Sequence, residues 1–82
     1  MKFSEWKLIA TYKLINLYNK YQDQPEIASD LNLLIIKLKE LRARDLANFL
    51  IHVHMVRQTH NLHELQEIIP NASDLEEMMK RD

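Results

Sequence analysis

Four histidines in the second half of the chain could bind a metal ion or transfer a proton: His52, His54, His60 and His63. The first two are two positions apart, so on a helix their side chains point about 200° away from each other. They cannot hold one ion together. The other two each have a glutamate four residues further on, a spacing that places both side chains on one helical face.

The zinc-protease pattern of two histidines four apart on a helix is begun by this sequence but not completed. His63 and Glu64 match its first two positions, but Glu67 stands where the second histidine is required. The chain also has no Cys, which excludes thiolate metal sites and disulfides. We therefore predict no metal site and no cofactor, with the histidines in structural or surface roles.

The sequence gives little support for a catalytic site. The carboxylate pairs Glu64/Glu67 and Glu76/Glu77 fall on short segments that we expect to be exposed, where they should behave as ordinary acids. The chain has no Gly, which phosphate-binding loops need for positive φ and for close approach to the ligand. We predict that the protein is not an enzyme and has no small-molecule substrate.

The densest basic patch is formed by Lys37, Lys39, Arg42 and Arg44. To bind one nucleic-acid backbone, all four side chains would have to lie on one face of the helix. Each phosphate that they neutralise would then add to the affinity. At about 100° per helical residue, Lys39 and Arg42 point one way and Lys37 and Arg44 another. We therefore interpret these residues as a solvated surface, and keep as an alternative function a nucleic-acid-binding transcriptional regulator that uses them.

The charge is unevenly distributed along the chain. Residues 1–22 carry a net charge of +3, residues 61–82 carry −4, and the middle balances. The whole chain has a net charge of −1, which does little to oppose self-association.

The elements that must position these residues are helices. Between residues 25 and 41, large aliphatic side chains recur at steps of four and three, the spacing of one helical stripe: Ile27, Leu31, Leu34, Leu38 and Leu41. Similar patterns predict a single all-α domain over residues 1–82, a small antiparallel bundle. Its three main helices are expected at about 4–22, 25–42 and 45–60, and one or two short C-terminal helices at 62–69 and 74–81.

Capping residues mark the ends of these helices. Pro25 suits the first position of a helix, because its missing N–H has no intrahelical partner there. The apolar residues after Asp45 do not continue the helical stripe of residues 25–41 in register. We therefore expect a break there, with Asp45 as the cap of the third helix. Asn61 and Ser73 each precede a glutamate by three residues, as in a capping box. The alternative is one unbroken helix over 25–59, which would imply an extended dimer.

Apolar side chains exceed what so small a bundle is expected to bury. Leu33 and Ile36 fall on the far side of the second helix from its apolar stripe. On the first helix, Trp6, Tyr12 and Tyr18 are residue types that anchor protein interfaces. We predict that these five residues bind a partner.

The sequence thus favours a small protein–protein interaction module, a regulator or adaptor that binds a protein partner or itself as a homodimer. No apolar run approaches the roughly 20 residues that a membrane span needs, and no signal peptide is recognisable. We therefore expect a cytoplasmic protein that does not bind membranes. Size and a helical arrangement alone suggest a second alternative, a toxin or bacteriocin immunity-type protein.

Overall fold

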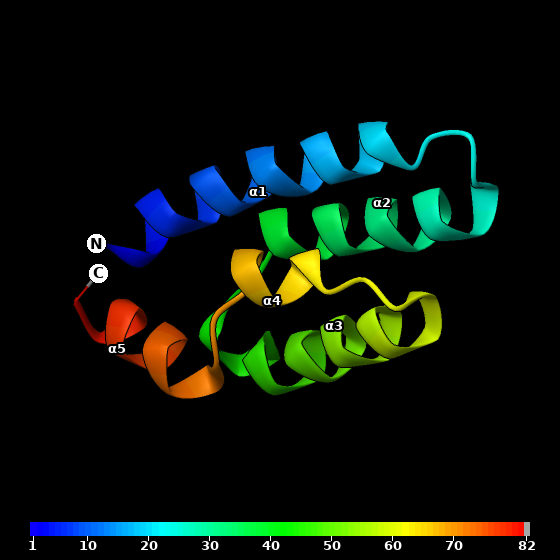
Figure 1. Ribbon diagram of the computed structural model, residues 1–82. Helices are drawn as coiled ribbons and strands as arrows, with labels where there is room; N and C mark the ends of the chain where they lie inside the picture. Colours follow the sequence, from blue (N-terminus) through cyan, green and yellow to red (C-terminus); the bar gives the residue numbers. More distant parts are fainter. Residues whose placement is uncertain (82) are drawn as a thin grey trace.

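The computed structural model describes residues 1–81, and the regular structure within that range is entirely helical (Figure 1). This confirms the predicted all-α fold class. The elements in chain order are α1 (Phe3–Lys20), α2 (Pro25–Lys39), the 3₁₀ turn η1 (Ala43–Asp45), α3 (Leu46–His60), α4 (Glu64–Ile68) and α5 (Ala72–Arg81).

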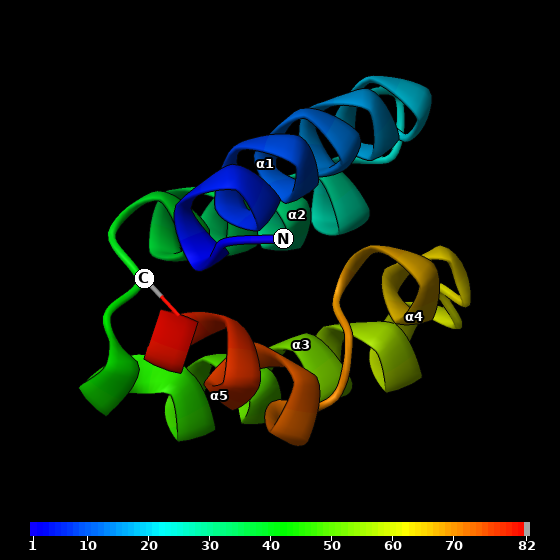
Figure 2. The same cartoon turned by 90° about the vertical axis from the view of Figure 1, so that its left-hand side faces the viewer.

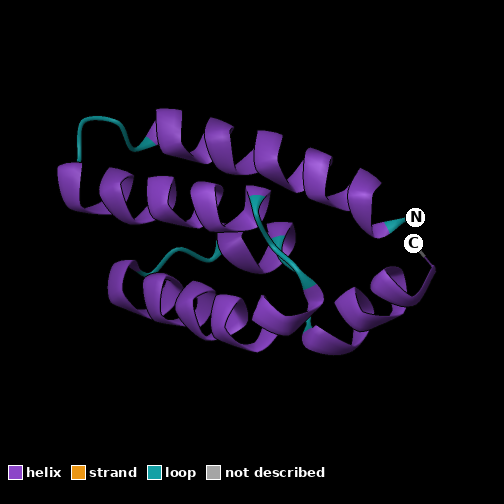
Figure 3. Cartoon of the chain, turned by 180° about the vertical axis from the view of Figure 1, so that it is seen from behind, coloured by secondary structure: helices purple, strands orange, loops and turns teal. Residues whose placement is uncertain are grey.

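The first two helices lie side by side along most of their length, joined by a short turn at one end of the molecule (Figures 1 and 3). Pro25 occupies the start of α2, as the sequence predicts. Helix α3 packs against α2, α4 packs against α1, and α5 packs against both α1 and α3. Figure 2 shows α2 between α1 and α3, with α4 set apart to one side. The helices form a compact bundle.

One hydrophobic core runs through the bundle. The stripe of α2 supplies Leu31, Leu34 and Leu38, which are completely buried, and Leu41 just beyond the helix is nearly so. Ile27, at the start of the stripe, is only partly buried. The short C-terminal helices and their connections contribute Leu62, Leu65, Ile69 and Leu75. Because these side chains complete the same core, α4 and α5 are held by the burial of apolar surface rather than by intrinsic helix propensity.

The chain does not continue as one helix from residue 25 to 59. It leaves α2 after Lys39, and both Leu41 and Leu46 turn inward on either side of η1. Asp45 lies at the N-cap position of α3 as expected, but its backbone is in the αR region and its side chain makes no capping hydrogen bond within residues 1–81. The 3₁₀ turn, rather than a side-chain cap, leads the chain into α3.

The predicted roles of Asn61 and Ser73 need correction. Asn61 ends α3 instead of starting the next helix, with φ of 55° and ψ of 44°. The backbone N–H of Leu62 donates to the carbonyl of Arg57 (3.0 Å), as in a Schellman motif, and α4 begins only at Glu64. Ser73 lies inside α5, whose start is capped by Asn71. The Asn71 Oδ1 atom accepts a hydrogen bond from the backbone N–H of Asp74 (2.9 Å).

Candidate functional site

Large apolar side chains remain exposed on three of the helices. Six of them form pairs three or four residues apart: Leu8 and Tyr12 on α1, Leu33 and Ile36 on α2, and Ile51 and Met55 on α3. Their exposed fractions lie between 43% and 63%. Residues at this spacing are neighbours on a helix surface, so each pair forms a small apolar patch.

The direction in which each pair points follows from its spacing, in residues, from the buried positions of the same helix. Leu33 is two positions from the buried Leu31, and Ile51 is two positions from the buried Phe49. Two residues correspond to about 200° on a helix. The exposed side chains therefore point away from the core, where no other part of the described chain covers them.

The outer surfaces of α1 and α2 adjoin each other. Leu8 and Lys7 from α1, and Lys39 from the end of α2, line one shallow groove between these helices. We use the term α1–α2 face for the exposed side of the helix pair, defined by Leu8, Tyr12, Leu33 and Ile36. Its apolar side chains and its groove make it the candidate interaction site.

Three of the five predicted partner-binding residues lie on this face: Tyr12, Leu33 and Ile36, with exposed fractions of 63%, 43% and 46%. Trp6 is buried in the core, where its ring lies 5.6 Å from that of Phe3 between centroids. Tyr18 is half-buried and packs against the core. The structure therefore gives Trp6 a packing role in this chain.

Leu8, Ile51 and Met55 were not among the predicted binding residues. Leu8 shares the helical face of Tyr12, and this spacing could have identified it. Ile51 and Met55 lie within a run of apolar residues on α3, where hydrophobicity alone does not separate buried from exposed positions. Only the packing of α3 against its neighbours distinguishes them.

The four basic residues of the predicted patch do not gather on one face. Lys39 lines the groove beside α1, whereas Lys37 lines a pocket with Asn48 and Phe49 of α3. Arg44 lines a third groove, towards α5. All four side chains, including Arg42, are exposed. This arrangement spreads their charge around the end of α2 rather than concentrating it for phosphate binding.

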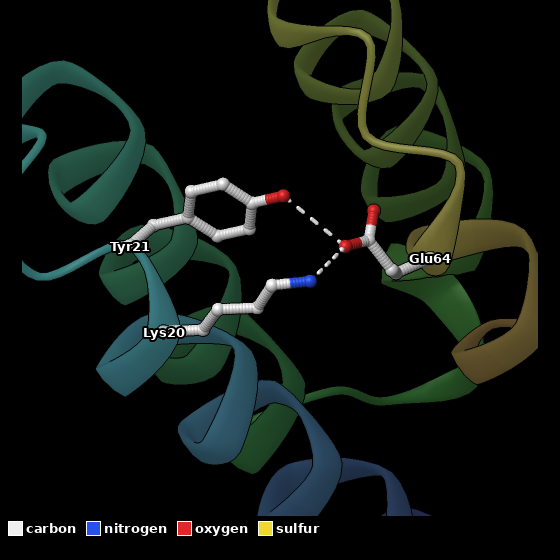
Figure 4. A network of polar contacts seen from close by, with 3 residues as sticks. All are labelled: Lys20, Tyr21 and Glu64. Atoms are coloured by element: carbon white, nitrogen blue, oxygen red, sulfur yellow. Dashed lines mark hydrogen bonds and ion pairs between the residues drawn. The ribbon is translucent and has the colours of Figure 1, made fainter.

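A polar network joins α1 to α4 (Figure 4). The Glu64 Oε2 atom accepts hydrogen bonds from Lys20 Nζ (3.0 Å) and from the Tyr21 hydroxyl (3.1 Å). The pKa of the Glu64 carboxyl is lowered, first by its own backbone N–H and next by Lys20, and the pKa of Lys20 is raised by its hydrogen bond to Glu64. Because Lys20 is exposed, this network positions α4 and contributes little energy.

The histidines take separate partners. His60 Nε2 lies 2.6 Å from Asp30 Oδ2, while its expected neighbour Glu64 bonds to α1, so the two do not share an ion. Arg57 Nη2 donates to His54 Nδ1 (2.9 Å), which requires the unprotonated form of that ring nitrogen. Within the described chain, no group of three or more His, Cys, Asp or Glu side chains could hold a metal ion.

His52 is the histidine with the least favourable environment. Its Nδ1 atom is buried and has no hydrogen-bond partner among residues 1–81. Burial lowers the pKa of His52, and the positive charge of Lys37 lowers it further. Both effects disfavour the protonated form of the ring, which lies on α3 near Lys37 and Asp30 of α2.

None of the helices in residues 1–81 combines the length and apolar character needed to cross a membrane. Comparison of the chain with protein-family models, with curated proteins and with solved structures finds no match.

Proposed function

We propose that this chain is a small non-catalytic protein–protein interaction module, a regulator or adaptor that binds a protein partner or itself through its α1–α2 face. Its scaffold is an antiparallel bundle of three main helices, α1 to α3, closed by α4 and α5. In this proposal the bundle holds α1 and α2 rigidly side by side, so their outer surfaces act as one preformed docking surface.

The observation that carries the proposal is the exposure of Leu33 and Ile36. Fully burying one such side chain is worth about 1.5–3 kcal/mol, so a pair that is nearly half exposed leaves a substantial part of that gain unused. An isolated exposed aliphatic residue needs no explanation. Here Tyr12 is also exposed on the adjoining helix α1, and aromatic residues commonly anchor interfaces.

Substitution of a single exposed residue tests this proposal. We expect Ile36→Lys or Leu33→Lys to abolish binding while leaving the melting temperature within a few degrees of wild type, because both side chains face away from the core. Binding is measured as the solution mass in sedimentation, and by pull-down with the purified chain as bait.

Ile9→Lys is the matched control. Ile9 is 42% exposed on the same bundle, but it is two positions from both Lys7 and Thr11, which line the groove beside α2. It therefore points about half a turn away from α2. The proposal fails if Ile9→Lys and Ile36→Lys have equal effects on binding, or if the chain is monomeric and retains no protein whose capture depends on Ile36.

A further inference from the structure

We propose that the groove between the start of α1 and the end of α2 binds an acidic, partly apolar peptide segment of the partner protein, with a carboxylate held between Lys7 and Lys39. We call this site the Lys7–Lys39 groove, after the two basic residues that line it. The inference rests on the proposed function and deepens it by naming the chemistry of the partner. Leu8 belongs to both the groove and the α1–α2 face, so the two surfaces are continuous.

The groove combines two basic side chains with an apolar lining. Lys7 lies near the start of α1 and Lys39 is the last residue of α2, so the two positive charges come from different helices to one hollow. Phe3 and Leu41, both buried, and Leu8, which is 60% exposed, supply the apolar lining. The volume of the hollow is about 450 Å³. That is within the range of roughly 300–1,000 Å³ that is typical of ligand sites.

The positive charges of the groove are not neutralised within residues 1–81. The ion pairs found there involve neither Lys7 nor Lys39. The Lys7 ammonium donates one hydrogen bond in this range, to the carbonyl of Leu41 (3.5 Å), which leaves two of its three N–H groups for a ligand. Because Lys7 is half-buried, part of its hydration is lost without an opposite charge in return. A bound carboxylate would supply that charge.

The acidic residues at this end of the molecule face elsewhere. Glu40 and Asp45 line the pocket on the α3 side of α2. Glu5 is two positions from Lys7, which corresponds to about 200° around α1. No acidic side chain of the described residues lines the groove, so its local charge is positive.

A single carboxylate beside an aliphatic side chain matches this groove better than a polyanion does. Glu5 and Glu40 are exposed within two residues of Lys7 and Lys39, and they would repel the successive phosphates of a nucleic acid. The apolar lining favours an aliphatic neighbour of the carboxylate, because its surface is then also removed from water. A glutamate or aspartate next to a leucine-type residue presents this combination.

Titration of the full chain with short synthetic peptides tests the inference. The probe is a hexapeptide of alternating glutamate and leucine with both ends blocked. One control peptide carries glutamine in place of each glutamate, and the other carries alanine in place of each leucine. NMR chemical shifts of the isotope-labelled chain report both affinity and position.

We expect the probe to shift the backbone amides of Lys7, Leu8, Lys39 and Leu41 before all others. It should bind about tenfold more tightly than either control peptide, since each control lacks one of the two contacts. Absence of shifts at the groove, or equal affinity for the glutamine peptide, overturns the inference.

Lys39→Gln and Lys37→Gln form a matched pair of variants. Each removes one positive charge from an exposed side chain of α2, but Lys39 lines the groove whereas Lys37 lines the pocket towards α3. Lys39→Gln should weaken binding of the probe by about fivefold, and Lys37→Gln by much less, because it removes only long-range attraction. Lys39→Arg should retain binding. Equal effects of the two glutamine variants overturn the inference, and circular dichroism verifies that each variant is folded.

The outcomes separate this inference from the function beneath it. If Ile36→Lys abolishes association with a partner but the probe does not bind in the groove, the proposed function stands and the acidic-peptide site is overturned. If the probe binds as expected and no Ile36-dependent association exists, the α1–α2 face is overturned and the groove alone is the binding site.

Two other occupants of the groove are distinguished by the same measurement. A single-stranded thymidine decamer that binds at Lys7 and Lys39 more tightly than the probe would identify a nucleic-acid site. Shifts of the groove amides that depend on the concentration of the chain, without any peptide, would identify a second copy as the occupant. Either result overturns the acidic-peptide site.

Discussion

The Nε2 atom of His60, the last residue of α3, lies 2.6 Å from the carboxylate of Asp30 near the start of α2. The His60 side chain is 10% exposed and that of Asp30 is 40% exposed. Since an ionised carboxylate can only accept, the histidine Nε2–H donates this hydrogen bond. The contact fixes the end of α3 against α2, 30 residues earlier in the chain.

Asp30→Asn should lower the free energy of unfolding by about 1 kcal/mol, since a hydrogen bond to a charged group is worth more than a neutral one and solvent at Asp30 screens part of it. Urea denaturation of Asp30→Asn, His60→Gln and the double variant measures the coupling. Strictly additive effects of the two substitutions would show that the contact carries no energy.

Glu64 should give the stability of the bundle a dependence on acid pH. Its folded-state pKa lies below the ordinary value of 4.5, so its contribution is complete at neutral pH. That contribution is lost as the pH falls from 4.5 through the folded pKa. At pH 7, Glu64→Gln should cost about 0.5 kcal/mol, a typical value for a partly exposed pair. A cost that persists undiminished at pH 3 would contradict this assignment.

His52 should make the protein less stable as the pH falls below 6.5. Because its folded-state pKa is lowered, the unfolded chain takes up a proton at this histidine before the folded chain does, which favours unfolding. His52→Leu removes both this proton uptake and the unpartnered Nδ1 atom. We expect the variant to be more stable than wild type, by a margin that grows between pH 7.5 and pH 5.5 in urea denaturation. A constant margin would rule out the titration of His52 as its cause.

Asn61 should tolerate Gly better than Ala. With φ of 55°, it occupies the left-handed region, which costs an ordinary residue about 1–2 kcal/mol but costs Gly almost nothing. Asn61→Ala should therefore lower the free energy of unfolding by about 1 kcal/mol, while Asn61→Gly should change it little. Thermal melting compares the two. Equal stabilities would mean that the end of α3 does not depend on this backbone conformation.

The helical periodicity was sufficient to predict the all-α class and the burial of Leu31, Leu34 and Leu38. Periodicity is a local property of the sequence, and an apolar stripe repeated over several turns is compatible with few structures other than an amphipathic helix. The start of α2 at Pro25 was equally predictable, because proline restricts its own backbone. The capping roles of Asn61 and Ser73 were not predictable, since Asn and Ser suit several positions near helix ends.

The sequence by itself determined which residues could form apolar helical stripes. It also excluded thiolate metal sites and glycine-dependent phosphate-binding loops, because the chain contains no Cys and no Gly. Only the tertiary structure decided which stripes are covered. Trp6 and Tyr12 are both aromatic residues of α1, yet Trp6 lies in the core and Tyr12 faces outward. The physical reason is that burial depends on which helix packs against which face, and this is set jointly by all the helices that share the core. For the same reason, Lys20 and Glu64 meet across 44 residues of sequence with no local signal to indicate it.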